Sequence, residues 1–159
     1  MDIIIINKGI SNEDKNCNYY SQNEAIGNGI LLCDENKNEV EVGGYIFNKS
    51  FSINLMRLST IIPYFSNKNL ALIKMDIEGG EGKAIEDAIV LINKMHVPYI
   101  FSEYNPYFLK RHGTDPKKFL QLFIDNGYKI SVKGFLSKSF ISINDIKTVN
   151  NLYFIYSED

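Results

Sequence analysis

The sequence predicts an α/β fold in which helices pack on a largely parallel sheet. Three short apolar runs, Ile3–Ile6, Ala71–Met75 and Val97–Phe101, have the length and composition of strands. Such runs are typical of strands that are buried in a sheet. Segments with helical periodicity separate them, and alternating strands and helices favour a parallel sheet with helices on its faces. With 159 residues the chain is long enough for one domain with a buried core.

The first third of the chain predicts few regular elements. Residues 3–6 form a β-branched run that we expect to be a buried strand, followed by a turn. The polar segment 11–38 predicts a loop or short hairpin strands. Gly27 and Gly29 are interpreted as a turn, because a phosphate-binding loop would need a preceding strand and a following helix. Residues 39–42 alternate in polarity and predict one further strand.

The remaining two thirds predict three helices and a C-terminal hairpin. Residues 53–65 have helix-like spacing of apolar side chains, and residues 84–95 form a clear amphipathic helix. Asp115 followed by proline predicts the start of a third helix, which Asn126 and glycine end. The last two strands are predicted at 128–132 and 152–156, joined as a hairpin.

Composition excludes several classes of protein. The net charge of −2 provides no electrostatic attraction for nucleic acid, so we expect no such partner. No apolar stretch approaches the roughly 20 residues of a membrane helix, and we expect no membrane association. Cys17 and Cys33 have no metal or redox spacing, so the sequence predicts reduced thiols and a cytoplasmic location.

Carboxylates follow two neighbouring strands of the predicted sheet. Asp76 ends one strand and Glu103 ends the next, and ligands of open α/β sheets bind beyond the carboxyl ends of the strands. Glu78 and Glu81 lie on the glycine-rich turn, where glycine allows a sharp bend and a close approach to a ligand. Glu81 could equally cap the following helix. A site with this much negative charge would suit a cation, hydroxyl groups or an amino group.

The segment "LIKMDIEGGE", residues 72–81, resembles the "IKIDVEGAE" signature of the FkbM family of S-adenosylmethionine-dependent methyltransferases. Other segments are similar to the family's pattern and follow its order. They are "IIIINKGISNED" near the N-terminus, "MRLSTII", "PYIFSE" and "FLQLFIDNGYKI". The resemblance covers nearly the whole chain, and the acidic signature is its most specific part.

The resemblance implies a Rossmann-like class I methyltransferase sheet without its first two strands. The family's opening "DiGAniG" strand and loop, and the second strand with its ribose-binding acid, are not found in the sequence. We therefore expect residues 1–159 to form a single, N-terminally truncated domain whose exposed sheet edges favour self-association.

The resemblance also implies a reaction and roles for particular residues. The reaction is transfer of a methyl group from S-adenosylmethionine to a hydroxyl of a sugar or small natural product. Asp76 would lie beside the methionine end of the cofactor, and Ile10 and Ser11 beside its adenine. Glu78 and Glu103 would orient the acceptor hydroxyl or take its proton. Without the glycine-rich loop we expect weak cofactor affinity, and no metal is assigned.

Three alternatives remain open. The first is a catalytically inactive methyltransferase remnant that acts as a binding or interaction domain. The second is an amino-methyltransferase, because Tyr104-Asn105-Pro106-Tyr107 faintly resembles an "NPPY" motif that stacks a flipped base. The third is a metal-dependent hydrolase that uses the same three carboxylates, although His96 and His112 are predicted on surface turns.

Overall fold

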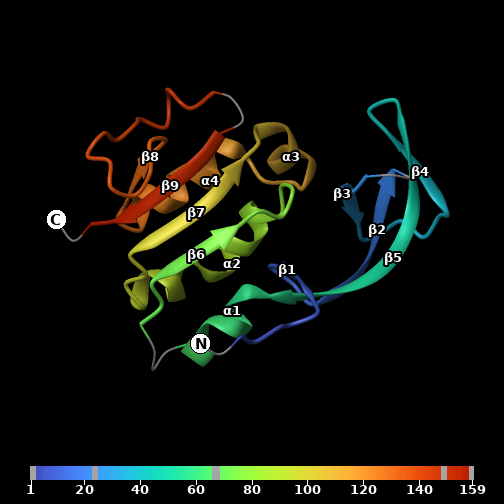
Figure 1. Cartoon of the computed structure of the whole chain (residues 1–159), viewed down its shortest axis with the longest axis horizontal. Coiled ribbons are helices and arrows are strands. Elements are labelled where there is room, and N and C mark those ends of the chain that lie inside the picture. The colour runs from blue at the N-terminus through green and yellow to red at the C-terminus, as the bar shows by residue number, and fades with distance from the viewer. Residues whose placement is uncertain (1–2, 23–24, 66–68, 148–149, 158–159) are drawn as a thin grey trace.

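A computed structural model describes residues 3–22, 25–65, 69–147 and 150–157, which form a mixed α/β fold with two separate sheets (Figure 1). The first sheet has the order β1-β5-β2-β3. The strand β4 pairs with the start of β5, and β1 pairs with its end. The second has the order β6-β7-β9-β8. The strands of the first sheet are β1 (Gly9–Ser11), β2 (Lys15–Gln22), β3 (Ala25–Leu32), β4 (Glu39–Val42) and β5 (Tyr45–Arg57). Those of the second are β6 (Leu72–Met75), β7 (Tyr99–Tyr104), β8 (Tyr128–Ser131) and β9 (Asn150–Tyr156).

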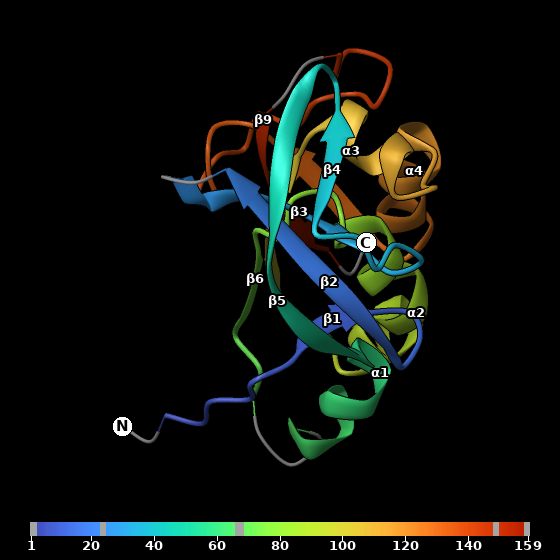
Figure 2. The ribbon, with the colours of Figure 1, turned by 90° about the vertical axis from the view of Figure 1, so that its right-hand side faces the viewer.

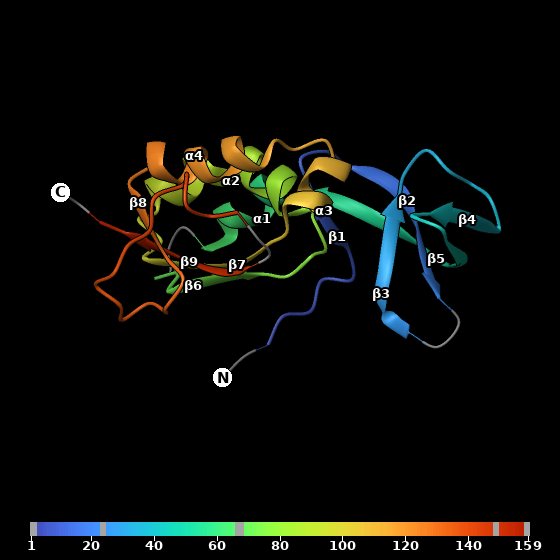
Figure 3. The ribbon, with the colours of Figure 1, turned by 90° about the horizontal axis from the view of Figure 1, so that it is seen from above.

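Helices lie along one face of the second sheet (Figure 3). The helix α2 (Glu81–Lys94) joins β6 to β7, which are parallel, in the register Leu72 to Tyr99 through Met75 to Ser102. This arrangement confirms the predicted strand–helix–strand unit, a connection that is right-handed in nearly all proteins. The inner side of α2 is completely buried, because its apolar residues recur at helical spacing. These residues are Ala84, Ile85, Ala88, Ile89 and Ile92.

The helix α4 (Pro116–Asp125) completes this core. Asp115 accepts hydrogen bonds of 2.9 Å from the backbone N–H groups of Lys117 and Lys118, as a helix N-cap does. Phe123 stacks on Phe154 of β9 with ring centroids 3.7 Å apart. The predicted C-terminal hairpin is confirmed, since β8 and β9 are antiparallel. A short helix that the sequence did not predict, α3 (Pro106–Arg111), follows β7.

The expected buried strand at Ile3–Ile6 is wrong. These residues pair with no described strand, and their side chains are 76%, 77%, 87% and 47% exposed. The strand begins later, at Gly9, where β5 offers hydrogen bonds to β1. An apolar run becomes a strand only where a neighbouring strand accepts it, and residues 3–6 have no such neighbour among the described residues.

The helix expected at 53–65 is also largely wrong. The strand β5 continues to Arg57, because it pairs with β2 on one side and with β1 on the other. Only α1 (Leu58–Ile61) is α-helical, and a 3₁₀ turn follows at Ile62–Phe65. Figure 2 shows β5 running the length of the first sheet and turning directly into α1. Pairing on both edges thus outweighs the local helical pattern.

Of the two expectations for the segment 11–38, a loop or short hairpin strands, the hairpin is confirmed, with strands of eight residues each. β2 and β3 are antiparallel, and Gly27 and Gly29, which we expected in a turn, lie within β3. The ring of Tyr19 on β2 occupies the space beside Gly29 that a side chain would need. The pairs of the first sheet are mainly antiparallel, so the expectation of a largely parallel sheet is wrong there. In the second sheet β6, β7 and β8 run in the same direction and only β9 runs against them, so this sheet is largely parallel as expected.

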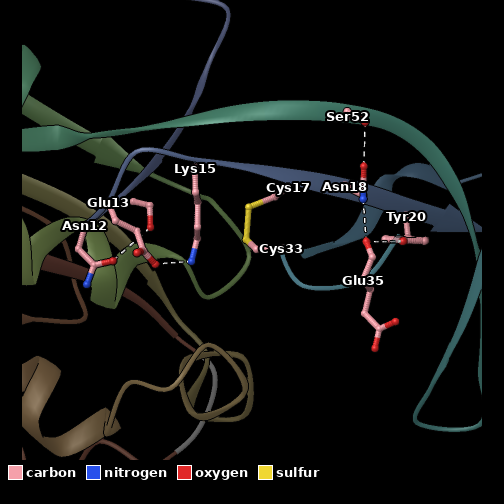
Figure 4. The surroundings of a disulfide bond; sticks show 10 residues. Asn12, Glu13, Lys15, Cys17, Asn18, Tyr20, Cys33, Glu35 and Ser52 are labelled. Atoms are coloured by element: carbon pink, nitrogen blue, oxygen red, sulfur yellow. Dashed lines mark hydrogen bonds and ion pairs between the residues drawn. A yellow bond between two sulfur atoms is a disulfide. The ribbon is translucent and has the colours of Figure 1, made fainter. Parts of the chain in front are cut away.

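A disulfide joins Cys17 and Cys33 across this hairpin (Figure 4). The strand register pairs Asn18 with Leu32, so the next positions outward are the two cysteines. Their Cα atoms are 3.9 Å apart. The expectation of two reduced thiols is therefore wrong in this structure, since pairing of the strands brings together residues that are 16 apart in sequence. No helix in the described part of the chain has the length and apolarity needed to cross a bilayer.

Candidate active site

The acidic loop between β6 and α2 has an unusual backbone. Glu78 has φ 54° and Gly79 has φ 97°, so two consecutive residues are left-handed. Such a conformation is costly for a residue with a side chain, and strained backbone of this kind clusters at functional sites. Gly79 packs directly on α3, since a Cβ atom there would lie 2.7 Å from the backbone of Phe108. The sequence predicted that the glycines allow the backbone to approach a ligand closely. In the structure Gly79 makes this close approach to α3 instead.

Glu81 holds this loop in place from the first turn of α2. Its side chain is buried, with the residue 2% exposed, and accepts 2.8 Å hydrogen bonds from the N–H groups of Ile77 and Gly79. Burial raises the pKa of Glu81, and these hydrogen bonds offset part of that effect. Glu81 is thus structural, but it does not cap α2 as one interpretation expected, because Gly80 is the N-cap without a side-chain cap hydrogen bond and Glu81 binds the loop that precedes the helix.

Three other carboxylates come together at the ends of β6 and β7. Met75 pairs with Ser102, so the next residues, Asp76 and Glu103, lie side by side at the same edge. The turn brings Glu78 to them, and carboxylate oxygens of the three residues lie within 4.8 Å of one another. β7 continues to Tyr104, so Glu103 lies inside the strand rather than after it. The predicted proximity of Asp76 and Glu103 is thus confirmed, while the chemical roles of all three residues stay predictions.

The charges in this cluster disfavour one another. Burial raises the pKa of Glu78, and the neighbouring Glu103 and Asp76 raise it further. Burial and Asp76 likewise raise the pKa of Glu103. Asp76 is more exposed and forms a 3.3 Å ion pair with Lys74. A carboxylate with a raised pKa is a better proton acceptor, and three converging carboxylates are also a ligand set that hard divalent cations prefer.

A cavity of about 610 Å³ opens between this cluster and the first sheet. All three residues to which the resemblance assigns cofactor contacts, Ile10, Ser11 and Asp76, line it, as does Glu78. Glu103 is not among its lining residues. We call this space the first cavity. Another cavity, of about 730 Å³, lies between α2 and the start of β6, but no carboxylate lines it.

His112 is a wall residue that sequence reasoning missed. It follows α3, lines the first cavity and is half-buried, whereas a surface turn was expected. Burial and the neighbouring Arg111 lower its pKa, and a hydrogen bond with the backbone of Glu78 opposes this effect. No motif in the sequence marks this position, because α3 itself was not predicted. His96, by contrast, is exposed after α2, as expected.

The faint "NPPY" resemblance has a structural explanation. Asn105 is the N-cap of α3, and its side chain accepts hydrogen bonds from the N–H groups of Tyr107 and Phe108 at 3.1 and 3.3 Å. Pro106 occupies the first turn, where its missing N–H costs nothing. These four residues therefore carry the signature of a helix start, which removes the reason to invoke base binding.

Together these features define an α/β protein with an acidic cluster at the carboxyl ends of two parallel strands, beside a cavity of ligand size. A family model described as the methyltransferase FkbM domain matches residues 3–130 of the 159-residue chain. The chain belongs to this family, and its two-sheet α/β architecture is consistent with a methyltransferase-like fold. Comparison with curated proteins gave no significant match, and neither did comparison with solved structures.

Proposed function

We propose that the chain is an S-adenosylmethionine-dependent O-methyltransferase with a Rossmann-like class I core, acting on a hydroxyl of a sugar or small natural product. One observation carries the proposal. The acidic signature shared with the family brings Asp76, Glu78 and Glu103 within 4.8 Å of one another, at the edge of the cavity that Ile10 and Ser11 line.

The first cavity fits the cofactor in size and in chemistry. Its volume of about 610 Å³ falls within the range of roughly 300–1,000 Å³ that is typical of small-molecule sites. Ile10 and Ile53 provide apolar wall for an adenine ring. Asp76 can bind the positively charged amino group, and Lys83 lies in the same wall, where it can attract the carboxylate.

The bound cofactor would supply a methyl group on a positively charged sulfur, which an oxygen nucleophile can attack. The protein's part is to align the acceptor hydroxyl and to remove its proton. Glu78 and Glu103 are suited to accept that proton, because the raised pKa values of both carboxyl groups increase their basicity. Asp76 holds the cofactor's amino end beside them, and Glu81 fixes the loop that carries Glu78.

The affinity of this chain for the cofactor is proposed to be low. No described strand ends in a glycine-rich turn of the "DiGAniG" type, which would hold the carboxylate and ribose. Each missing charge-assisted contact is worth on the order of 1.5–3 kcal/mol. Two or three such losses weaken binding by roughly three orders of magnitude or more. An inactive remnant that binds a partner is therefore the alternative function. A cytoplasmic location was expected from reduced thiols, and the Cys17–Cys33 disulfide removes that argument for it.

Calorimetry and a methyl-transfer assay test the proposal. Titration of S-adenosylmethionine into the 159-residue chain should show weak or no binding, and micromolar affinity would contradict the low-affinity expectation. A chimera that adds a family member's glycine-rich strand and loop should bind the cofactor and methylate a sugar hydroxyl. Asp76→Ala in the chimera should abolish transfer, whereas Asp125→Asn, an exposed aspartate on α4, should not. A chimera that binds the cofactor but transfers no methyl group would favour the inactive alternative.

A further inference from the structure

A second cavity of about 540 Å³ adjoins the acidic cluster on the side of α3. The strand β5 and the turn before it form one wall, with Tyr45 and Phe47, and α3 forms the other, with Tyr107 and Arg111. The two walls come from distant parts of the chain. They meet because α3 lies at the end of the second sheet that faces β3 (Figures 1 and 3). We call this space the second cavity.

The two cavities share part of their walls. Glu78 and Gly29 line both of them. A cofactor in the first cavity and another molecule in the second would therefore meet at Glu78, which belongs to the carboxylate cluster. A methyl acceptor has to reach such a meeting point, because transfer requires the nucleophile and the methyl group to be in contact.

The second cavity combines aromatic side chains with one arginine, and Glu78 adds a carboxylate where it borders the first cavity. The side chains of Tyr45 and Tyr107 remain 63% and 61% exposed, and Phe47 and Phe108 are half-buried beside them. Aromatic faces pack well against the apolar faces of ring compounds. Arg111 is half-buried, and no carboxylate of the described residues lies within ion-pair distance of it. An arginine without an acidic partner in a ligand-sized cavity is suited to a carboxylate or phosphate group.

We propose that the second cavity binds the methyl acceptor and that Arg111 selects an acceptor ring carrying an anionic group, a carboxylate or a phosphate. The inference rests on the proposed methyl transfer and adds to it the charge of the substrate. The aromatic side chains hold the ring, Arg111 binds its anionic group, and a ring hydroxyl then points towards Glu78. Arg111 acts here as a specificity-determining residue and takes no part in proton transfer.

Binding of simple probes tests this inference without the cofactor. Ligand-observed NMR titrations of the 159-residue chain with glucuronate, glucose 6-phosphate and glucose compare an anionic ring with a neutral one. The anionic probes should bind about tenfold or more tightly than glucose, since a charge-assisted hydrogen bond is worth about 1.5–3 kcal/mol. Preference for glucuronate over the phosphate, or the reverse, identifies which anion the site accepts.

Variants of α3 provide the controls. Arg111→Gln should remove the preference for anionic probes and leave glucose binding unchanged. Lys110→Gln removes the same charge one residue earlier, at an exposed position outside the cavity, and should retain the preference. Arg111→Lys should keep part of it. Circular dichroism and thermal unfolding confirm that each variant is folded.

The outcomes separate this inference from the proposed function. Equal binding of glucose and glucuronate by the unmodified chain would overturn the inference, as would an equal loss of preference in Lys110→Gln and Arg111→Gln. Failure of the chimera to methylate would leave these binding results intact and would count against methyl transfer alone. Methylation of neutral sugars only, by an active chimera, would retain the function and reject the anionic acceptor.

Discussion

Glu78 and Glu81 lie three residues apart and differ in their environment. Glu81 is fully buried and finds two backbone donors, so its side chain fixes the turn. Glu78 is half-buried on a left-handed residue and faces two other carboxylates. The first arrangement stabilises the fold, and the second places unfavourable charge where the proposed chemistry needs a base. Cost in stability is common at active sites.

We predict that Glu78→Gln stabilises the chain above neutral pH. The pKa of Glu78 is raised in the folded state, so its stabilising contribution is complete below the ordinary glutamate pKa and is lost as pH rises through the folded value. At pH 7 to 8 the charged side chain therefore disfavours folding. Removing the charge should raise Tm by roughly 1–3 °C, because near-surface charge interactions rarely exceed ~1 kcal/mol. The gain should disappear near pH 4.

Thermal unfolding between pH 4 and pH 8, with a chelator present, measures this effect. Glu86→Gln is the matched control, since Glu86 is exposed on α2 and pairs with Lys83. This control should give no increase in Tm. The quantity compared is the Tm of Glu78→Gln minus the Tm of the unmodified chain at the same pH. If this difference is no larger at pH 8 than at pH 4, the cluster does not disfavour the charged side chain.

Individual site residues could be predicted from the sequence where the end of a strand determined their position. Asp76 and Glu103 could be placed together because neighbouring parallel strands end at the same edge. Arg111 and His112 could not be found in this way. They belong to the end of a six-residue helix that periodicity does not reveal, and their functional setting comes from the distant strands β3 and β5. Long-range packing of this kind leaves no local pattern.

The β2–β3 hairpin is the element that most changes the expected architecture. Its strands place Tyr19 and Leu31 in the wall of the first cavity, and Cys33 follows directly after β3, although the sequence predicted only a loop or short strands there. Strong alternation is absent from "AIGNGILL", and two glycines weaken the strand signal. Pairing with β2, the covering ring of Tyr19 and the disulfide supply what local propensity lacks. The helices α2 and α4, in contrast, were predicted well, because amphipathic periodicity marks α2 and the start and stop residues Asp115 and Asn126 mark α4.

We predict that the disulfide contributes about 3 kcal/mol to stability. Cross-linking residues 16 apart restricts the unfolded chain, and a loop of about 15 residues gives approximately this value. Replacing both Cys17 and Cys33 with serine should therefore lower Tm by roughly 6–12 °C. Urea or thermal unfolding without reductant provides the measurement.

A reductant provides the internal control for this prediction. Dithiothreitol should lower the Tm of the unmodified chain towards that of the double variant and should leave the variant unchanged. An unmodified chain whose Tm does not respond to dithiothreitol would carry two free thiols, as the sequence alone suggested.

At the scale of the molecule, the two sheets remain separate and leave apolar edges. Among the described residues β6 pairs with β7 alone, and Leu72 is 47% exposed on it. The isoleucines of 3–6 are exposed as well. An unpaired strand edge and an exposed β-branched run favour contact between chains. The proposed self-association through sheet edges rests on these features.

We predict that the chain self-associates reversibly and that charge at these edges prevents it. Light scattering coupled to size-exclusion chromatography should show a mass above that of the monomer as concentration rises. Ile4→Lys combined with Leu72→Lys should weaken association at least tenfold. Val90→Lys alters an equally exposed apolar residue on α2, away from both edges, and should have no such effect. A concentration-independent monomer would refute the proposal.

The strand β5 connects the two cavities. Tyr45 and Phe47 near its start line the second cavity, while Ile53 and Leu55 near its end line the first. With 13 residues at about 3.3 Å each, it has a contour length of roughly 40 Å, curves between its two ends (Figure 1) and contributes residues to both cavities. A ligand that restricts the motion of β5 at one end also reduces the motion of the strand at its other end. The second ligand then loses less conformational entropy on binding, so the two occupants can cooperate through rigidity as well as through contact.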